Sequence, residues 1–93
     1  MNQAELYRKI YEKYGKEKCI LLVVEELSEL TKELCKNADR GFDNRNEILD
    51  EFSDVLNVLT YLQVIYNISD AELAEYKTKK YTEQIIPKVM EQL

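Results

Sequence analysis

The chain has 93 residues, enough for one small domain with a modest core. Its net charge of -5 and its pI near 4.8 argue against a nucleic-acid groove or an anionic membrane surface as its partner. No basic leader with an apolar stretch opens the sequence, and no apolar run approaches the ~20 residues of a membrane span. We therefore expect a soluble, cytoplasmic protein that binds neither nucleic acid nor membrane.

Helix-breaking residues are rare, since the chain holds only two glycines and one proline, and strand-like alternation is weak. We expect one all-α domain over residues 1–93, a helical bundle of three to four helices. Hydrophobic residues make up 45% of the chain, more than such short helices can easily hide. We expect dimerisation to complete a four-helix core.

The first two predicted helices cover residues 2–14 and about 16–37. In the first, Leu6 and Ile10 recur with three tyrosines at helical spacing, and Gly15 provides a possible left-handed end. These tyrosines are most simply core and rim residues, and stacking on a nucleobase is the alternative. The second helix carries a broad apolar stripe. Cys19 and Cys35, 16 residues apart on this helix, would lie ~24 Å apart, so we expect both to be reduced.

Two further helices follow a polar loop at residues 36–46. Asn44 and Glu47 have the spacing of a capping box, and the helix they open should run to Tyr66. That helix is apolar on more than one side, which predicts an exposed strip covered by a second subunit. Ser69 should cap a fourth helix through a capping box with Glu72, and Pro87 should interrupt or kink whatever helical pattern continues to Leu93.

Two acidic runs stand out, EELSEL on the second helix and DEFSDVLN on the third. Each contains carboxylates three residues apart, Glu26 with Glu29 and Glu51 with Asp54, and this spacing places both on one helix face. A loop of about ten residues lets the two helices pack antiparallel and brings the pairs together. Oxygen ligands alone suit a hard cation, Mg²⁺ or Mn²⁺.

Three alternatives compete with this interpretation. Glu47 and Asp50 have the same three-residue spacing, although the match of DEFSD to EELSE favours Glu51 and Asp54. A di-iron bundle normally uses Glu-x-x-His, and this chain has no histidine. The acids could also be plain solvated charge on a non-enzymatic helical interaction module or an inactive relative of an enzyme.

The EELSEL and EFSDVL segments resemble the EExxE and ExxD motifs of the MazG-like, all-α nucleoside triphosphate pyrophosphohydrolases. The resemblance covers roughly residues 20–66, about half of the chain, and looks like the short, single-domain members. It implies Mg²⁺-dependent hydrolysis of a (d)NTP to the nucleoside monophosphate and pyrophosphate, in the control of nucleotide pools. It also implies a homodimer or a dimer of dimers.

The same resemblance implies roles for individual residues. The catalytic set would be Glu25, Glu26, Glu29, Glu51 and Asp54, and the last four of these would be the metal ligands. Asn57, one turn beyond Asp54, would contact the substrate. The family's usual downstream basic residues have no clear counterpart here, and Lys77 and Lys80 are the candidates for binding phosphate.

Overall fold

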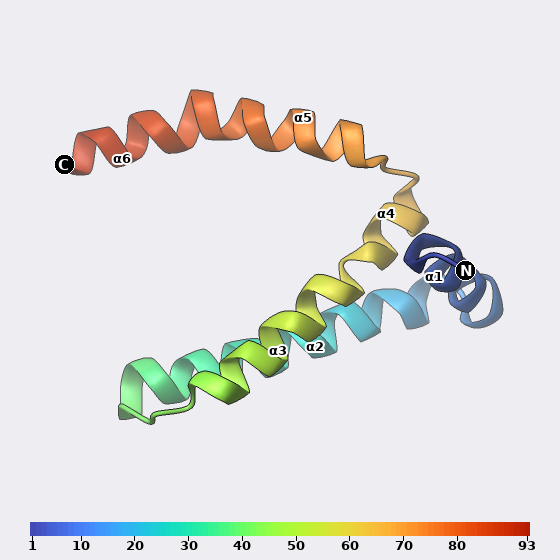
Figure 1. Cartoon of the computed structure of the whole chain (residues 1–93), viewed down its shortest axis with the longest axis horizontal. Coiled ribbons are helices and arrows are strands. Elements are labelled where there is room, and N and C mark those ends of the chain that lie inside the picture. The colour runs from blue at the N-terminus through green and yellow to red at the C-terminus, as the bar shows by residue number, and fades with distance from the viewer.

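A computed structural model describes residues 1–93, and the chain is helical almost throughout (Figure 1), which confirms the all-α prediction. The elements are α1 (Gln3–Tyr14), α2 (Lys16–Arg40), α3 (Arg45–Val58), α4 (Thr60–Tyr66), α5 (Asp70–Lys80), the π-helix η1 (Tyr81–Ile85) and α6 (Ile86–Gln92). They form four helical units, because only Leu59 separates α3 from α4, and α5, η1 and α6 run on without a gap. None of them combines the length and apolar character needed to cross a bilayer.

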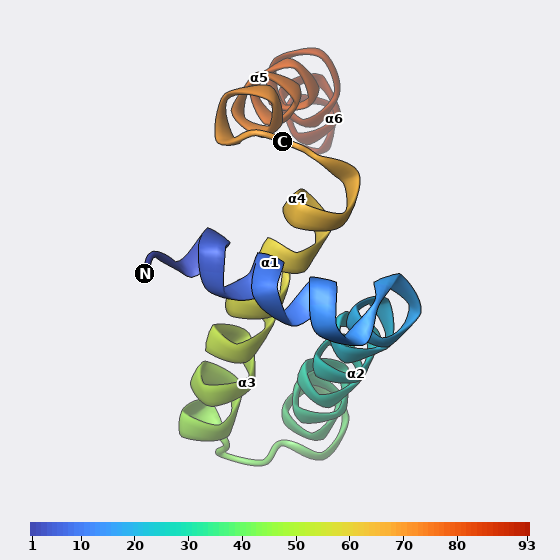
Figure 2. The same cartoon turned by 90° about the vertical axis from the view of Figure 1, so that its right-hand side faces the viewer.

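Helices α2 and α3 form an antiparallel hairpin, and α1 lies across its open end against α4 (Figure 2). The core sits at this crossing, where Cys19, Val23 and Tyr61 are buried together. The rings of Tyr7 and Tyr61 meet edge to face with 4.4 Å between their centroids. The expectation that the α1 tyrosines serve in packing is confirmed for Tyr7 and for the half-buried Tyr11.

Both cysteines are free, as expected, with Cys19 buried and Cys35 exposed on α2. Burial raises the pKa of the Cys19 thiol, so it remains protonated and behaves as a small core residue.

The two glycines end helices in different ways. Gly15 has φ 87° and ψ 170°, so the expected left-handed helical end is wrong there: φ is positive but ψ is extended. Gly41 instead adopts the left-handed conformation, with φ 66° and ψ 26°, and its N–H donates to the carbonyl of Asn37 at 3.1 Å. Helix α2 consequently continues to Arg40, three residues beyond its expected end, and the loop is shorter than expected.

The long third helix predicted to reach Tyr66 is interrupted at Leu59. The Leu62 N–H donates to the Leu59 carbonyl at 3.0 Å, a tightened turn that starts a new helical segment. Beyond this turn, α4 packs against α1 and buries Tyr61 and Val64. The apolar character of residues 48–66 was predicted correctly. The turn at Leu59 accompanies the packing of α4 against α1, and a local sequence pattern does not predict such a contact.

Asn44 precedes α3 as expected, but the predicted capping box is wrong because its side chain makes no capping hydrogen bond. Its Nδ2 instead donates to the carbonyl and the carboxylate of Glu33, at 2.9 and 2.8 Å, and its Oδ1 accepts from Asn37 at 3.2 Å. Glu33 also pairs with Lys36 at 3.3 Å. The hydrogen bond from Asn44, with help from Lys36, lowers the pKa of the Glu33 carboxyl. Asn44, only 6% exposed, therefore ties the loop back onto α2.

The C-terminal arm, residues 70–92, stands apart from the other helices and runs to the same side of α4 as the α2–α3 hairpin (Figures 1 and 2). Ser69 caps it as predicted, its Oγ accepting from the Glu72 N–H at 3.0 Å. Pro87, which lacks an N–H, stands in the first turn of α6 directly after the π-helix. The chain stays helical through Pro87 to Gln92, so no break occurs there, and the departure from the regular α-helix is the π-helix that ends at Ile85. Apart from a hydrogen bond of 2.8 Å from Nε2 of Gln63 to the Asp70 carboxylate at its start, the arm makes no contact with α1 to α4, and every residue from 69 to 93 is exposed.

Replacing Asn44 by alanine should lower the free energy of unfolding by about 1–3 kcal/mol, because Glu33 and Asn37 lose their buried partner. Urea denaturation followed by circular dichroism measures this loss. The control is Asn46→Ala, an exposed amide two residues along, which should change the stability by less than about 0.5 kcal/mol. Equal effects of the two substitutions would contradict a tethering role for Asn44.

Candidate metal centre

Helices α2 and α3 meet along a seam formed by a regular series of less exposed residues. On α2 the series is Cys19, Val23, Glu26, Leu30 and Glu33, and on the other side it runs from Asn44, just before α3, through Ile48, Glu51, Val55 and Val58. The three- and four-residue spacing of both series is the one that packs one helix against another. Glu26 and Glu51 therefore occupy seam positions that apolar side chains would ordinarily fill.

Three carboxylates converge at this level of the seam. Glu26, Glu51 and Asp54 each offer an oxygen, and these oxygens lie within 4.8 Å of one another. Asp54 joins the group because it follows Glu51 by nearly one helical turn. The only ion pair in the chain joins Lys36 to Glu33, so no lysine or arginine neutralises these three residues, called the carboxylate triad below.

The environment of the triad disfavours negative charge. Partial burial is the largest cause that raises the pKa of the Glu26 carboxyl, followed by repulsion from Asp54 and neighbouring acids. The pKa of Glu51 is raised for the same reasons, with burial first and Asp54 second. Ionised carboxylates that repel one another in a half-buried seam destabilise the fold unless protons or a cation compensate them.

Glu29 and Glu25, the other predicted acids, lie outside the triad. Both are exposed on α2. Glu29 is near enough for its charge to raise the pKa of Glu26 and of Glu51, whereas Glu25 affects Glu26 alone. The structure thus brings together three of the four predicted ligands and leaves Glu29 at the edge of the group.

The rival pair Glu47 and Asp50 does not form such a group. Glu47 lies with Glu33 and Lys36 around a hollow at the loop end of the hairpin. Asp50 is exposed, and it acts on Glu26 and Glu51 only as a nearby charge. The geometry favours Glu51 and Asp54 as the inner pair.

The predicted substrate-binding residues are dispersed within a single chain. Asn57 accepts a hydrogen bond of 3.1 Å from Nε2 of Gln3, which ties the α3 turn beyond Asp54 to α1. Lys77 and Lys80 belong to the C-terminal arm, which does not contact the hairpin in the same chain. No lysine of the arm therefore approaches the triad of its own subunit.

Gln3 is a residue that the sequence alone did not identify. It lines a polar groove of about 660 Å³ between α1 and α4, together with Asn2, Arg8, Gln63 and Asn67. Its contact with Asn57 spans 54 residues, so no local motif or helical spacing could have indicated it. Only the crossing of α1 over the open end of the hairpin brings the two amides together.

No family model, curated protein or solved structure matches this chain. The resemblance to MazG-like enzymes accordingly stays a prediction that depends on the acidic motifs.

Metal-free protein should gain thermal stability as the pH is lowered from about 7 toward 5. A carboxyl whose pKa is raised by folding binds more protons in the folded state, so its protonation favours folding. Glu33 acts in the opposite direction, because folding lowers the pKa of its carboxyl. Its contribution to stability is lost only when the pH falls below the ordinary glutamate pKa.

Thermal denaturation in a chelating buffer at a series of pH values measures this dependence. A Glu26→Gln/Glu51→Gln variant should melt at a higher temperature at pH 7 and respond less to pH. A variant that melts at a lower temperature, with the wild-type pH response, would show that the triad is not under electrostatic strain.

Proposed function

We propose that this protein hydrolyses a (deoxy)nucleoside triphosphate to the nucleoside monophosphate and pyrophosphate, with Mg²⁺ or Mn²⁺ as cofactor. The observation that carries the proposal is the triad of Glu26, Glu51 and Asp54, in which oxygens lie within 4.8 Å inside a helical seam that supplies no cation. The sequence resemblance supports the nucleotide as substrate and a role in the control of nucleotide pools.

The triad fits a hard divalent cation. Two oxygens bound to one octahedral Mg²⁺ at about 2.1 Å are separated by roughly 3–4.2 Å. The triad oxygens, within 4.8 Å, need to approach one another by up to about 1.8 Å, because at least two of the three pairs must be cis. Rotation of glutamate and aspartate side chains accommodates that shift, and the ligand set contains neither nitrogen nor sulfur. Glu29, at the edge of the triad, is the natural fourth protein ligand.

The proposed reaction breaks the bond between the α-phosphorus and the oxygen that bridges it to the β-phosphate. A bound divalent ion would neutralise phosphate charge and make the phosphorus more electrophilic. Water adds to the α-phosphorus and pyrophosphate departs. A carboxylate of the triad orients this water and accepts its proton. Burial raises the pKa of the Glu26 and Glu51 carboxyls, which makes them better proton acceptors. Lys77 and Lys80 are proposed to hold the departing pyrophosphate.

A second candidate is a non-enzymatic interaction module. The exposure of all residues from 69 to 93, including a run of apolar side chains, favours this alternative because such surfaces commonly bind partners. Release of pyrophosphate from a panel of (d)NTPs in the presence of Mg²⁺ separates the two: an interaction module would release none.

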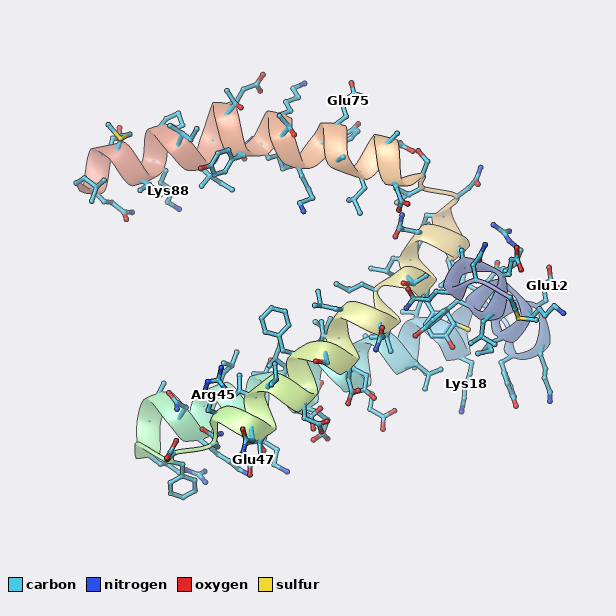
Figure 3. All side chains as sticks on the ribbon, in the orientation of Figure 1. Glu12, Lys18, Arg45, Glu47, Glu75 and Lys88 are labelled. Atoms are coloured by element: carbon cyan, nitrogen blue, oxygen red, sulfur yellow. The ribbon has the colours of Figure 1, made fainter.

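Asp54→Asn should reduce turnover by about 100-fold or more while leaving helix content unchanged, because it keeps the side-chain shape and removes a ligand charge. Pyrophosphate release measures the rate. Glu12→Gln, an exposed substitution on α1 away from the hairpin (Figure 3), should leave the rate unchanged. If Asp54→Asn hydrolyses at the wild-type rate and Glu47→Gln does not, the site belongs to the rival pair instead.

Millimolar Mg²⁺ or Mn²⁺ should raise the melting temperature, since an ion that binds only the folded state stabilises it by mass action. NaCl at the same ionic strength is the control for general screening. Glu51→Gln should weaken the response to Mg²⁺, whereas Glu12→Gln should retain it. An identical melting temperature with Mg²⁺ and with matched NaCl would exclude the metal site.

A further inference from the structure

The polar groove of about 660 Å³ between α1 and α4 lies where the C-terminal arm leaves the rest of the chain. One wall is the first half of α1, and the other is formed by α4, residues 67–69 and the first residue of the arm. Ligand pockets in proteins measure about 300–1,000 Å³, so the groove has room for a small molecule. It is separate from the carboxylate triad, because no residue of the triad lines it.

The lining of the groove suits a polar ligand. Only three of its eleven lining residues are hydrophobic. Four of the others carry side-chain amides, which can both donate and accept hydrogen bonds: Asn2, Gln3, Gln63 and Asn67. Gln3 and Gln63 donate from their NH₂ groups to partners within the chain, and their oxygens remain as acceptors. The groove therefore offers hydrogen-bonding groups of both kinds to a bound molecule.

The groove also contains one positive and one negative side chain that do not pair. Arg8 on α1 and Asp70 at the start of α5 both line it, yet the only ion pair in the chain joins Lys36 to Glu33. Arg8 is exposed, and its planar guanidinium presents five N–H donors in a fork that suits a carboxylate. Asp70 keeps acceptor capacity for a cation, since Gln63 donates to only one of its oxygens. Each end of a zwitterion thus finds a partner in the groove.

The elements that carry these two charges are held in place. Helix α1, which carries the guanidinium, packs against α4 with the rings of Tyr7 and Tyr61 in contact. The Asp70 carboxylate accepts a hydrogen bond of 2.8 Å from Nε2 of Gln63, which also donates to the Ile68 carbonyl at 3.2 Å. A ligand therefore meets walls that are already positioned, which lowers the entropic cost of binding.

The charge balance favours a zwitterion over a simple anion or cation. The charges of Arg8 and Asp70 cancel within the groove, and the chain as a whole has a net charge of -5. An anion bound at Arg8 is repelled by Asp70 and by the field of an acidic protein, whereas a cation bound at Asp70 is repelled by Arg8. A ligand that carries both charges satisfies both side chains and brings no net charge.

We infer that this groove binds a small zwitterion of the amino-acid type, with the ligand carboxylate at Arg8 and the ligand ammonium group at Asp70. Because Arg8 belongs to α1 and Asp70 to α5, the bound ligand joins the body of the chain to the arm. It thereby restrains the arm, which is otherwise tied to the body by residues 67–69 and the hydrogen bond from Gln63.

Titration calorimetry of the metal-free protein with free amino acids and with dipeptides tests the binding. The N-acetyl derivative of each ligand keeps the carboxylate and loses the ammonium charge, and the carboxamide derivative does the reverse. Each derivative should bind about tenfold more weakly than its parent, since each loses a charge-assisted hydrogen bond. Equal binding of either derivative would reduce the groove to a site for a single charge and overturn the inference. Failure of every zwitterion to bind at millimolar concentration would also overturn it.

Two variants that each remove one charge place the ligand in the groove. Arg8→Gln and Asp70→Asn should each weaken binding of the zwitterion by about tenfold. Asp70→Asn retains an oxygen that can accept from Gln63, so the start of the arm stays in place. The matched controls are Lys9→Gln and Glu75→Gln, which remove the same charges at exposed positions outside the groove and should bind like wild type. Equal affinities of the groove variants and the controls would exclude this site.

Hydrogen exchange provides a readout of the link to the arm. Saturation with the zwitterion should slow amide exchange in the first turns of α5, because the ligand joins Asp70 to α1, and should leave exchange in α3 unchanged. Arg8→Gln at the same ligand concentration should show no slowing. Slowing in α1 alone would place the ligand away from Asp70 and contradict the inference. None of these measurements involves hydrolysis, so an inactive protein that binds the zwitterion would refute the proposed function and support this site.

Discussion

The repulsion among Glu26, Glu51 and Asp54 is the constraint on which the hairpin depends. Two of these carboxylates stand in seam positions between α2 and α3, where the helices otherwise approach through apolar side chains. The two helices stay together because contacts at both ends of the seam hold them. Asn44 ties the loop end to Glu33 and Asn37, and the core around Cys19 and Tyr61 fixes the open end beneath α1.

This arrangement separates stability from chemistry along one pair of helices. The ends of the hairpin supply burial and hydrogen bonds, and its middle holds acids that weaken the fold when they are ionised. Local destabilisation of this kind is typical of functional sites, where charged groups are held in place by the surrounding structure. It also explains why the hairpin needs so firm a loop, since a loose one would let the acids move apart.

The sequence predicted what repeats along a helix and missed what depends on distant partners. Helical periodicity and residue spacing identified the four helical units, the cap at Ser69 and the proximity of Glu26, Glu51 and Asp54. The sequence did not predict the role of Asn44, because a capping motif is local whereas the hydrogen bond from Asn44 to Glu33 spans 11 residues. The sequence also did not predict the turn at Leu59 or the Gln3–Asn57 hydrogen bond, since both arise from packing against α1.

The exposed arm sets the order in which the helices of one chain lose their structure. Residues 70–92 hold a large part of the helix in this chain, and they are supported by backbone hydrogen bonds, the cap at Ser69 and one hydrogen bond from Gln63 to Asp70. A helix that no surface covers frays. The arm therefore unfolds before the hairpin and α1 on heating, and a frayed arm is an apolar tail open to proteolysis.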